Sequence, residues 1–230
     1  MSAVELLLSA AVATLLLYHV PGARILGWPL MLMATLVHEL GHGLTAMFVG
    51  GSFRRLEVWS NGSGAATYAG NFSRPSRALV AAGGPLGPPL AALLLFGAAT
   101  EPRWAHIALA VLAGALVLSA LIWLRNLFGF VFTLLLGAAL AALTWQASDP
   151  VAQFSCAFLA IQMSLSVFSR GDYLFKSAAN TTAGLMPSDT AQIAAALFGP
   201  YWFWGALIGA LSLAILGCGL WLVARTAIAL

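Results

Sequence analysis

Charged side chains are scarce in this chain of 230 residues. Aspartate, glutamate, lysine and arginine make up 7% of it, whereas hydrophobic residues make up 61%. Soluble domains carry about 25% charged residues, so most of this chain cannot face water. The formal net charge of +3 on so few ionisable groups says little about nucleic acid, and we expect no nucleic-acid partner. We therefore predict a polytopic integral membrane protein that lies in a lipid bilayer.

Cysteine and long polar segments are scarce as well. The two cysteines, Cys156 and Cys218, both lie inside apolar runs, which excludes a disulfide framework and a cysteine-based metal site. The longest polar connections, 50–76 and 169–199, are too short and too rich in glycine and serine to form a second core. Residues 1–230 are therefore predicted to form a single integral-membrane domain.

Long apolar runs dominate what remains, and a bilayer crossing needs about 20 residues. Seven runs qualify: 3–20, 28–49, 78–99, 104–123, 127–145, 151–168 and 201–224. They predict an all-α fold of about six to seven transmembrane helices.

The basic residues divide unevenly between the two sides that seven crossings define. One side carries Arg54, Arg55, Arg74, Arg77, Arg125, Arg170 and Lys176, and the other carries Arg24, Arg103 and Arg225. The positive-inside rule makes the first side cytoplasmic, with the amino terminus inside and the carboxy terminus outside. On the cytoplasmic side, Arg125 and Asn126 mark a membrane boundary or orient loop or substrate carbonyls.

The connection after the second run carries a turn signal, Asn61-Gly62-Ser63-Gly64, between hydrophobic residues. One interpretation is an ordinary polar loop. The other is a short membrane-associated β-hairpin whose free edge can pair with an extended peptide. The predicted fold includes this hairpin after the second helix.

The second run is interrupted by His38, Glu39 and His42, with the spacing His-Glu-x-x-His. Residues four apart lie on one face of a helix, so both imidazoles can bind one ion. Glu39 lies beside them and can act as general base on a zinc-bound water, the nucleophile in this chemistry. Ionisable residues inside a membrane are costly and indicate function by default. We therefore predict a zinc site on this helix.

A catalytic zinc usually takes three protein ligands, so one more is needed. Four carboxylates lie on the predicted side of the motif: Glu5, Glu57, Asp172 and Asp189. Asp172 is the preferred candidate, because it follows a run that is parallel to the histidine helix. Asp189 is typical of a helix start, with Ser188 or Asp189 as the cap. Glu57 is expected to pair with Arg54 or Arg55, and an ion pair with Arg170 or Lys176 is the alternative for Asp172.

Three segments together resemble the site-2 protease family of intramembrane zinc metalloproteases, in its compact branch without a PDZ domain. They are His-Glu-Leu-Gly-His at 38–42, Ala-Gly-Gly-Pro-Leu-Gly at 82–87 and Gly-Asp at 171–172. The resemblance implies zinc bound by His38, His42 and Asp172, with Glu39 as general base. It also implies hydrolysis of a peptide bond in or near a transmembrane segment of a client protein.

The same resemblance implies that the hairpin holds an unwound substrate. Asn61 and Gly62 in the turn, and Gly84 and Pro85 in the second segment, are the candidate substrate-binding residues. Nine arginines against one lysine are typical of a GC-rich bacterial genome. We therefore expect a multi-pass protein of a bacterial cell membrane, with the active site toward the cytoplasm.

Two alternatives remain open from the sequence. A zinc transporter would need a polar path, and the sixth run offers Ser155, Gln162, Ser164 and Ser166. A catalytically inactive relative would bind client helices without cutting them. The sequence indicates neither the identity of the substrate nor the oligomeric state.

Overall fold

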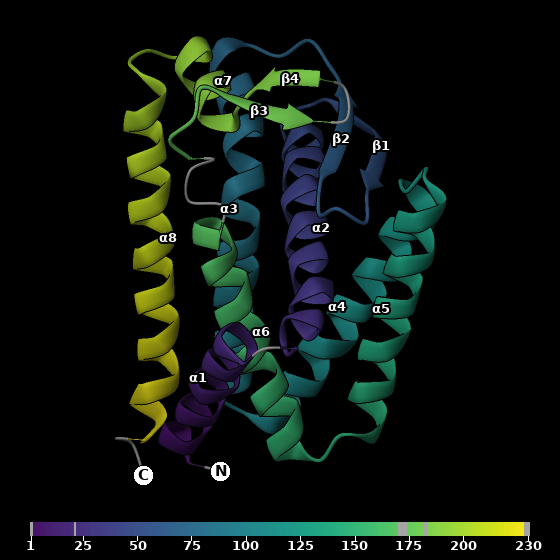
Figure 1. Ribbon diagram of the computed structural model, residues 1–230, viewed down its shortest axis with the longest axis vertical. Helices are drawn as coiled ribbons and strands as arrows, with labels where there is room; N and C mark the ends of the chain where they lie inside the picture. Colours follow the sequence, from purple (N-terminus) through teal and green to yellow (C-terminus); the bar gives the residue numbers. More distant parts are fainter. Residues whose placement is uncertain (1, 21, 170–173, 182–183, 228–230) are drawn as a thin grey trace.

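The computed structural model describes residues 2–20, 22–169, 174–181 and 184–227 of a helical bundle (Figure 1). Its helices are α1 (Ala3–His19), α2 (Arg24–Phe48), α3 (Arg74–Ala99), α4 (Pro102–Ile122), α5 (Leu127–Gln146), α6 (Asp149–Ser169), α7 (Asp189–Ala196) and α8 (Tyr201–Ala224). Its strands are β1 (Ser52–Val58), β2 (Gly64–Ala69), β3 (Ala178–Thr181) and β4 (Gly184–Pro187). The predicted helical fold with a hairpin after the second helix is confirmed.

Five of the described helices are long and apolar enough to cross a membrane: α3, α4, α5, α6 and α8. α2 has 25 residues and therefore also has the length, but it carries the polar motif. α1 has 17 residues and spans about 26 Å, less than the hydrocarbon core of about 30 Å. These helices agree with six crossings better than with seven.

The prediction that the first helix begins and the last helix ends on opposite sides of the bundle is wrong. α1 begins, and α8 ends, at the end of the bundle opposite the hairpins, and α1 lies in that half (Figure 1). α1 also contacts the short 3-10 helix Arg225–Ala227 that follows α8. Seven crossings would have separated these two segments, whereas α1 is at the short limit for a crossing and packs on α6 and α8.

α3 lies between α2, α6 and α8 and packs on all three. Small residues bring it close to α2, since a β-carbon at Gly41 would collide with the Gly83 carbonyl. A β-carbon at Gly87 would lie 2.9 Å from the Val37 carbonyl oxygen. Close packing of α3 therefore positions the motif helix.

The polar side chains of α6 hydrogen-bond to neighbouring groups. Gln162 accepts a bond from the Tyr18 hydroxyl (3.3 Å) and donates to the Thr14 hydroxyl (2.9 Å), both on α1. Ser155 donates to the Val151 carbonyl of its own helix (2.7 Å). The buried hydroxyl of Ser164 has no hydrogen-bond partner among the described residues. Gln162 thus attaches α1 to α6.

β1 and β2 form an antiparallel hairpin, so the loop alternative is wrong. Gly62 takes φ +86° in the turn, a conformation that glycine adopts without strain. Its carbonyl accepts a hydrogen bond from the Thr35 hydroxyl of α2 (2.9 Å), so the turn is attached to the motif helix. β3 and β4 form a second antiparallel hairpin, at the same end of the bundle as the first (Figure 1).

The connection between α4 and α5 occupies the outer edge of β1. The Leu56 amide donates to the Trp123 carbonyl (2.8 Å), and the Leu56 carbonyl accepts from the Arg125 amide (3.0 Å). The Asn126 side chain bonds both the amide (3.2 Å) and the carbonyl (2.7 Å) of Val58. Asn126 therefore orients a backbone carbonyl, as one prediction had it, but this carbonyl belongs to strand β1 and not to a loop.

This occupied edge fixes the direction of the backbone groups of β2. Leu56 faces Ala66, and Val58 faces Gly64, in the hairpin register. Opposed residues in an antiparallel pair turn their backbone groups either toward each other or both outward. Because Leu56 and Val58 turn theirs outward, Ala66 and Gly64 turn theirs toward the other edge of β2. This edge pairs with no strand in the described part of the chain, and we call it the free edge.

Candidate metal centre

α2 brings the two histidines of the motif together. Their Nε2 atoms lie 3.2 Å apart, and Nδ1 of His42 lies 2.7 Å from the Val80 carbonyl oxygen on α3. A carbonyl can only accept a hydrogen bond, so Nδ1 of neutral His42 carries the hydrogen. Its Nε2 is therefore left with a lone pair directed at His38, an arrangement that suits a shared cation.

Asp189 completes the cluster from a distant part of the chain. Its carboxylate oxygens lie 3.1 Å from Nε2 of His38 and 3.3 Å from Nε2 of His42. Tetrahedral zinc with bonds of about 2.0–2.1 Å holds its ligand atoms about 3.3–3.4 Å apart. The three side chains are therefore spaced as ligands of one ion, with a fourth position left over.

The backbone around Asp189 explains its location. Ser188 caps α7, with its hydroxyl accepting a hydrogen bond from the Ala191 amide (3.2 Å), so Asp189 is the first helical residue. α7 packs on α3 and α8, and Asp189 is only 4% exposed. Burial raises the pKa of Asp189, but positive charge on the adjacent imidazoles, when they are protonated, lowers it below its usual range. Asp189 is thus a buried carboxylate that contacts both imidazoles.

The structure brings His38 and His42 together, as the sequence predicted, and adds Asp189. Asp172, the preferred third ligand, lies outside the described residues. Asp189 is a helix start, as predicted, but the sequence carries no signal that this start lies over the motif. Within the described residues, His38, His42 and Asp189 are the one group close enough to hold a metal.

The other two candidate carboxylates have different partners. Glu57 pairs with Arg55 on the same strand (2.6 Å), as predicted. Glu5 forms a capping box with Ser2 at the start of α1, and this start lies at the opposite end of the bundle (Figure 1). Neither carboxylate contacts the histidines.

Glu39 lies between α2 and β2. A β-carbon at Gly64 would lie 2.6 Å from Cγ of Glu39 and 2.9 Å from its Oε1, so this glycine makes room for the side chain. Ala66 lies two residues further along β2, with its backbone beside the same carboxylate. The side chain of Glu39, the predicted general base, therefore lies beside the free edge of β2.

The four candidate substrate-binding residues have structural contacts of their own. Asn61 accepts hydrogen bonds from the amide (3.0 Å) and hydroxyl (2.7 Å) of Ser63, and Gly62 is buried against α2. Gly84 and Pro85 are buried in α3. Gly84 lies directly behind the His42 ring, where a β-carbon would collide with Nε2. A contact between these residues and a substrate stays a prediction.

The packing of Gly84 gives a test of the cluster geometry. Gly84→Ala is expected to displace the His42 ring and lower zinc affinity about tenfold or more, as loss of a ligand's supporting contacts does. Gly97→Ala on the same helix is the matched control, since a β-carbon there meets nothing within 4 Å. Competition titration with a zinc chelator measures both, and equal affinities would contradict the position of His42.

The bundle and the cluster together define a polytopic membrane protein with a candidate metal site at its hairpin end. The family model described as Peptidase M50B-like matches residues 7–219. The chain therefore belongs to this family, and so to the site-2 protease family of membrane metalloproteases. No curated protein and no solved structure matches the chain.

Proposed function

We propose that the protein is a zinc-dependent intramembrane endopeptidase that hydrolyses a peptide bond in or near a transmembrane segment of a client. One observation carries this proposal: two imidazole Nε2 atoms and a carboxylate lie 3.1–3.3 Å apart, beside Glu39. Membership in a peptidase family supports the same reaction.

His38, His42 and Asp189 are the proposed zinc ligands. A zinc ion bound there supplies Lewis acidity and lowers the pKa of a coordinated water to about 7. Glu39 accepts the proton of the attacking water and transfers it to the amine that leaves the cut bond. Val80 holds the hydrogen of His42 on Nδ1, which keeps the Nε2 lone pair available.

The free edge of β2 is the proposed binding site for the unwound client segment. A helix that unwinds within a membrane exposes backbone groups that need partners there. Gly64 and Ala66 turn their backbone groups to this edge, and Tyr68 follows in the same alternation. Strand addition along β2 brings the client backbone past Glu39, because Gly64 of β2 packs against the Glu39 side chain.

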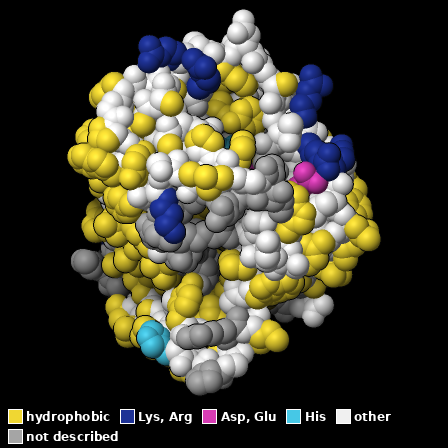
Figure 2. All heavy atoms as spheres, turned by 45° about the horizontal axis from the view of Figure 1, so that its top comes forward, with side chains coloured by type: hydrophobic (Ala, Val, Ile, Leu, Met, Phe, Trp, Pro, Cys, Tyr) yellow, Lys and Arg dark blue, Asp and Glu magenta, His cyan; other side chains and the backbone are white. Residues whose placement is uncertain are grey.

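The hairpin end is proposed to face the cytoplasm. Lysine and arginine side chains gather on this end, with hydrophobic side chains around it (Figure 2). Arg54 and Arg55 come from β1, and Arg74 and Arg77 from the start of α3. The positive-inside rule assigns such an end to the cytoplasmic side. A bacterial cell membrane remains the expected location.

A zinc transporter receives no support from the described residues. Transport requires ligands along a path, and the described part of the chain holds one group of metal-binding geometry. Gln162, the most polar residue of the proposed path, is bonded to Thr14 and Tyr18. A protein that binds clients without cutting them is separated from a peptidase by the experiment below.

Removal of the metal tests the proposed function. Purified protein in detergent is incubated with a library of synthetic transmembrane peptides, and the products are identified by mass spectrometry. We expect cleavage that stops when a chelator removes the zinc and returns when zinc, but not magnesium, is added back. Zinc binding without any cleavage would identify a scaffold that holds clients, and cleavage insensitive to chelation would exclude a metallopeptidase.

A further inference from the structure

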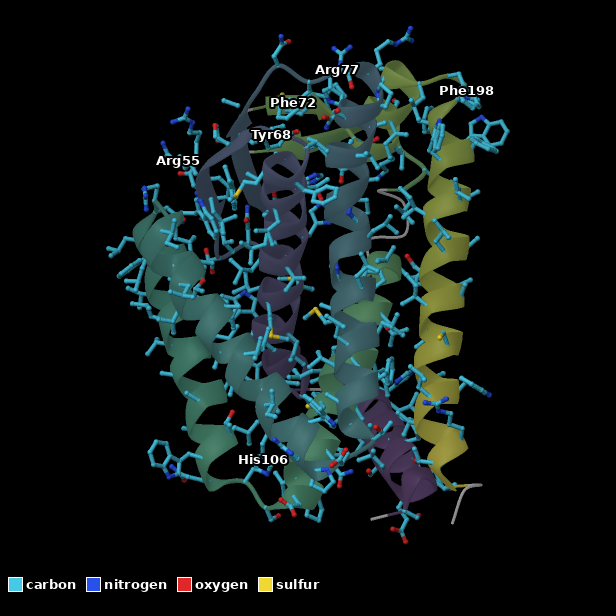
Figure 3. The ribbon with its side chains drawn as sticks, turned by 180° about the vertical axis from the view of Figure 1, so that it is seen from behind. Arg55, Tyr68, Phe72, Arg77, His106 and Phe198 are labelled. Carbon is cyan, nitrogen blue, oxygen red and sulfur yellow. The ribbon has the colours of Figure 1, made fainter. Side chains whose placement is uncertain are left out.

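A cavity of about 290 Å³ opens beside the candidate metal centre at the hairpin end. Its lining residues come from β2, the segment after it, α3 and α7: Tyr68, Phe72, Arg77, Val80, Gln192, Ala195 and Ala196. Tyr68, Phe72 and Arg77 lie close to one another at this end, far from His106 (Figure 3). None of these residues is a proposed zinc ligand or the general base.

The cavity adjoins the candidate metal centre. Val80 lines the cavity, and its carbonyl binds Nδ1 of His42. Gln192 stands one helical turn after Asp189 on α7. Burial raises the pKa of Tyr68, and the nearby carboxylates of Asp189 and Glu39 raise it further. A group bound in the cavity therefore lies within reach of the reacting centre.

The walls of the cavity are held in place by packing. The Tyr68 and Phe72 rings meet edge to face, with centroids 6.0 Å apart. Phe72 also lies against Gly70, where a β-carbon would be 2.6 Å from its ring. Arg74 joins α3 to α7, with Nε donating to the Ala196 carbonyl (2.9 Å). The cavity is therefore formed before any ligand arrives.

The polar groups on the cavity wall are hydrogen-bond donors. Arg77 carries a positive charge and has no ion-pair partner in the described part of the chain. The Gln192 side-chain amide donates one N–H to the Pro187 carbonyl (3.2 Å) and has a second N–H. The Tyr68 hydroxyl adds another donor, and Phe72 adds an apolar wall. Three hydrogen-bond donors, one of them cationic, can bind the carboxylate of an aspartate or glutamate side chain.

The spacing along β2 relates the cavity to the cleaved bond. Tyr68 is two residues beyond Ala66, which contacts Glu39, and two residues of a strand span about 7 Å. Alternate residues of an added strand point the same way, so a client side chain two positions from the cut reaches the cavity.

We propose that this cavity is a specificity pocket for an acidic side chain of the client, two residues from the cleaved bond. The proposal rests on the proposed peptidase function. Arg77 binds the client carboxylate, Gln192 and Tyr68 donate further hydrogen bonds, and Phe72 covers the stem. The enzyme therefore selects clients with glutamate or aspartate at this position.

Charge reversal tests the pocket during cleavage. Peptides with glutamate, glutamine or lysine at each position near the cut are compared in the zinc-loaded protein. Glutamate at the pocket position is expected to raise kcat/KM about threefold to fivefold over glutamine, as a partly exposed ion pair does. Arg77→Glu should lose this preference and favour lysine. Arg54→Glu, an exposed arginine on β1, is the matched control and should keep it.

A crosslinking experiment gives a readout that needs no cleavage. Photo-leucine at Ala195, on the cavity wall, is combined with Glu39→Gln, and the same peptides are irradiated with the protein. The glutamate peptide should crosslink more than its glutamine counterpart, and Arg77→Glu should reverse this order. Equal crosslinking of all peptides, or a glutamate preference that survives Arg77→Glu, would overturn the pocket even if cleavage is observed. Absence of cleavage with a normal crosslinking preference would overturn the peptidase function alone.

Discussion

Asp189→Ala is expected to lower zinc affinity by at least about 100-fold. The substitution removes one of three ligands, and loss of a ligand's supporting contact alone costs about 10–100-fold. It also leaves Nε2 of His38 and of His42 without the carboxylate that lies 3.1 and 3.3 Å away. Chelator competition on purified protein measures the affinity.

Two further aspartates serve as comparisons. Asp149→Ala removes a carboxylate that pairs with His106 (3.2 Å), far from the cluster (Figure 3), and should leave zinc affinity unchanged. Asp172→Ala tests the ligand that the family resemblance implied. Normal zinc affinity in Asp189→Ala, together with loss of zinc affinity in Asp172→Ala, would show that Asp172 is the third zinc ligand and Asp189 is not.

Glu39→Gln is expected to keep zinc and lose about 10²–10⁴-fold in cleavage rate, the usual contribution of a general base. The amide has the same shape and fits the space beside Gly64, but it cannot accept a proton at neutral pH. Elemental analysis measures the zinc content, and mass spectrometry follows the cleavage of one identified peptide.

Glu57→Gln is the matched control for this variant. Glu57 lies on the hairpin and pairs with Arg55, and loss of such an exposed pair should change the rate less than about fivefold. A Glu39→Gln protein that cuts at the wild-type rate would remove Glu39 from the mechanism. A variant that also loses zinc would make Glu39 part of the metal site.

Local patterns predicted the parts of the fold that neighbouring residues determine. Apolar runs predicted the long helices, and the Asn61-Gly62 turn predicted the first hairpin. His38 and His42 could be paired because four residues make about one helical turn. α1 was assigned a full crossing because it is apolar, although its 17 residues are at the short limit for one.

Contacts between distant segments could not be predicted in this way. Asp189 has the sequence features of an ordinary helix start, and only the packing of α7 on α3 brings it to the histidines. Likewise, Asn126 occupies one edge of the first hairpin through Val58, which decides that β2 has the free edge. Such pairings depend on how whole helices pack, and a single sequence does not record this.

A zinc K-edge X-ray absorption spectrum of the purified wild-type protein tests the proposed metal centre most directly. We expect one zinc per chain with nitrogen and oxygen ligands at about 2.0–2.1 Å and the outer-shell scattering of two imidazoles. Sulfur ligands at about 2.3 Å would instead indicate Cys156 or Cys218. That result, or zinc without imidazole scattering, would contradict a site built from His38, His42 and Asp189.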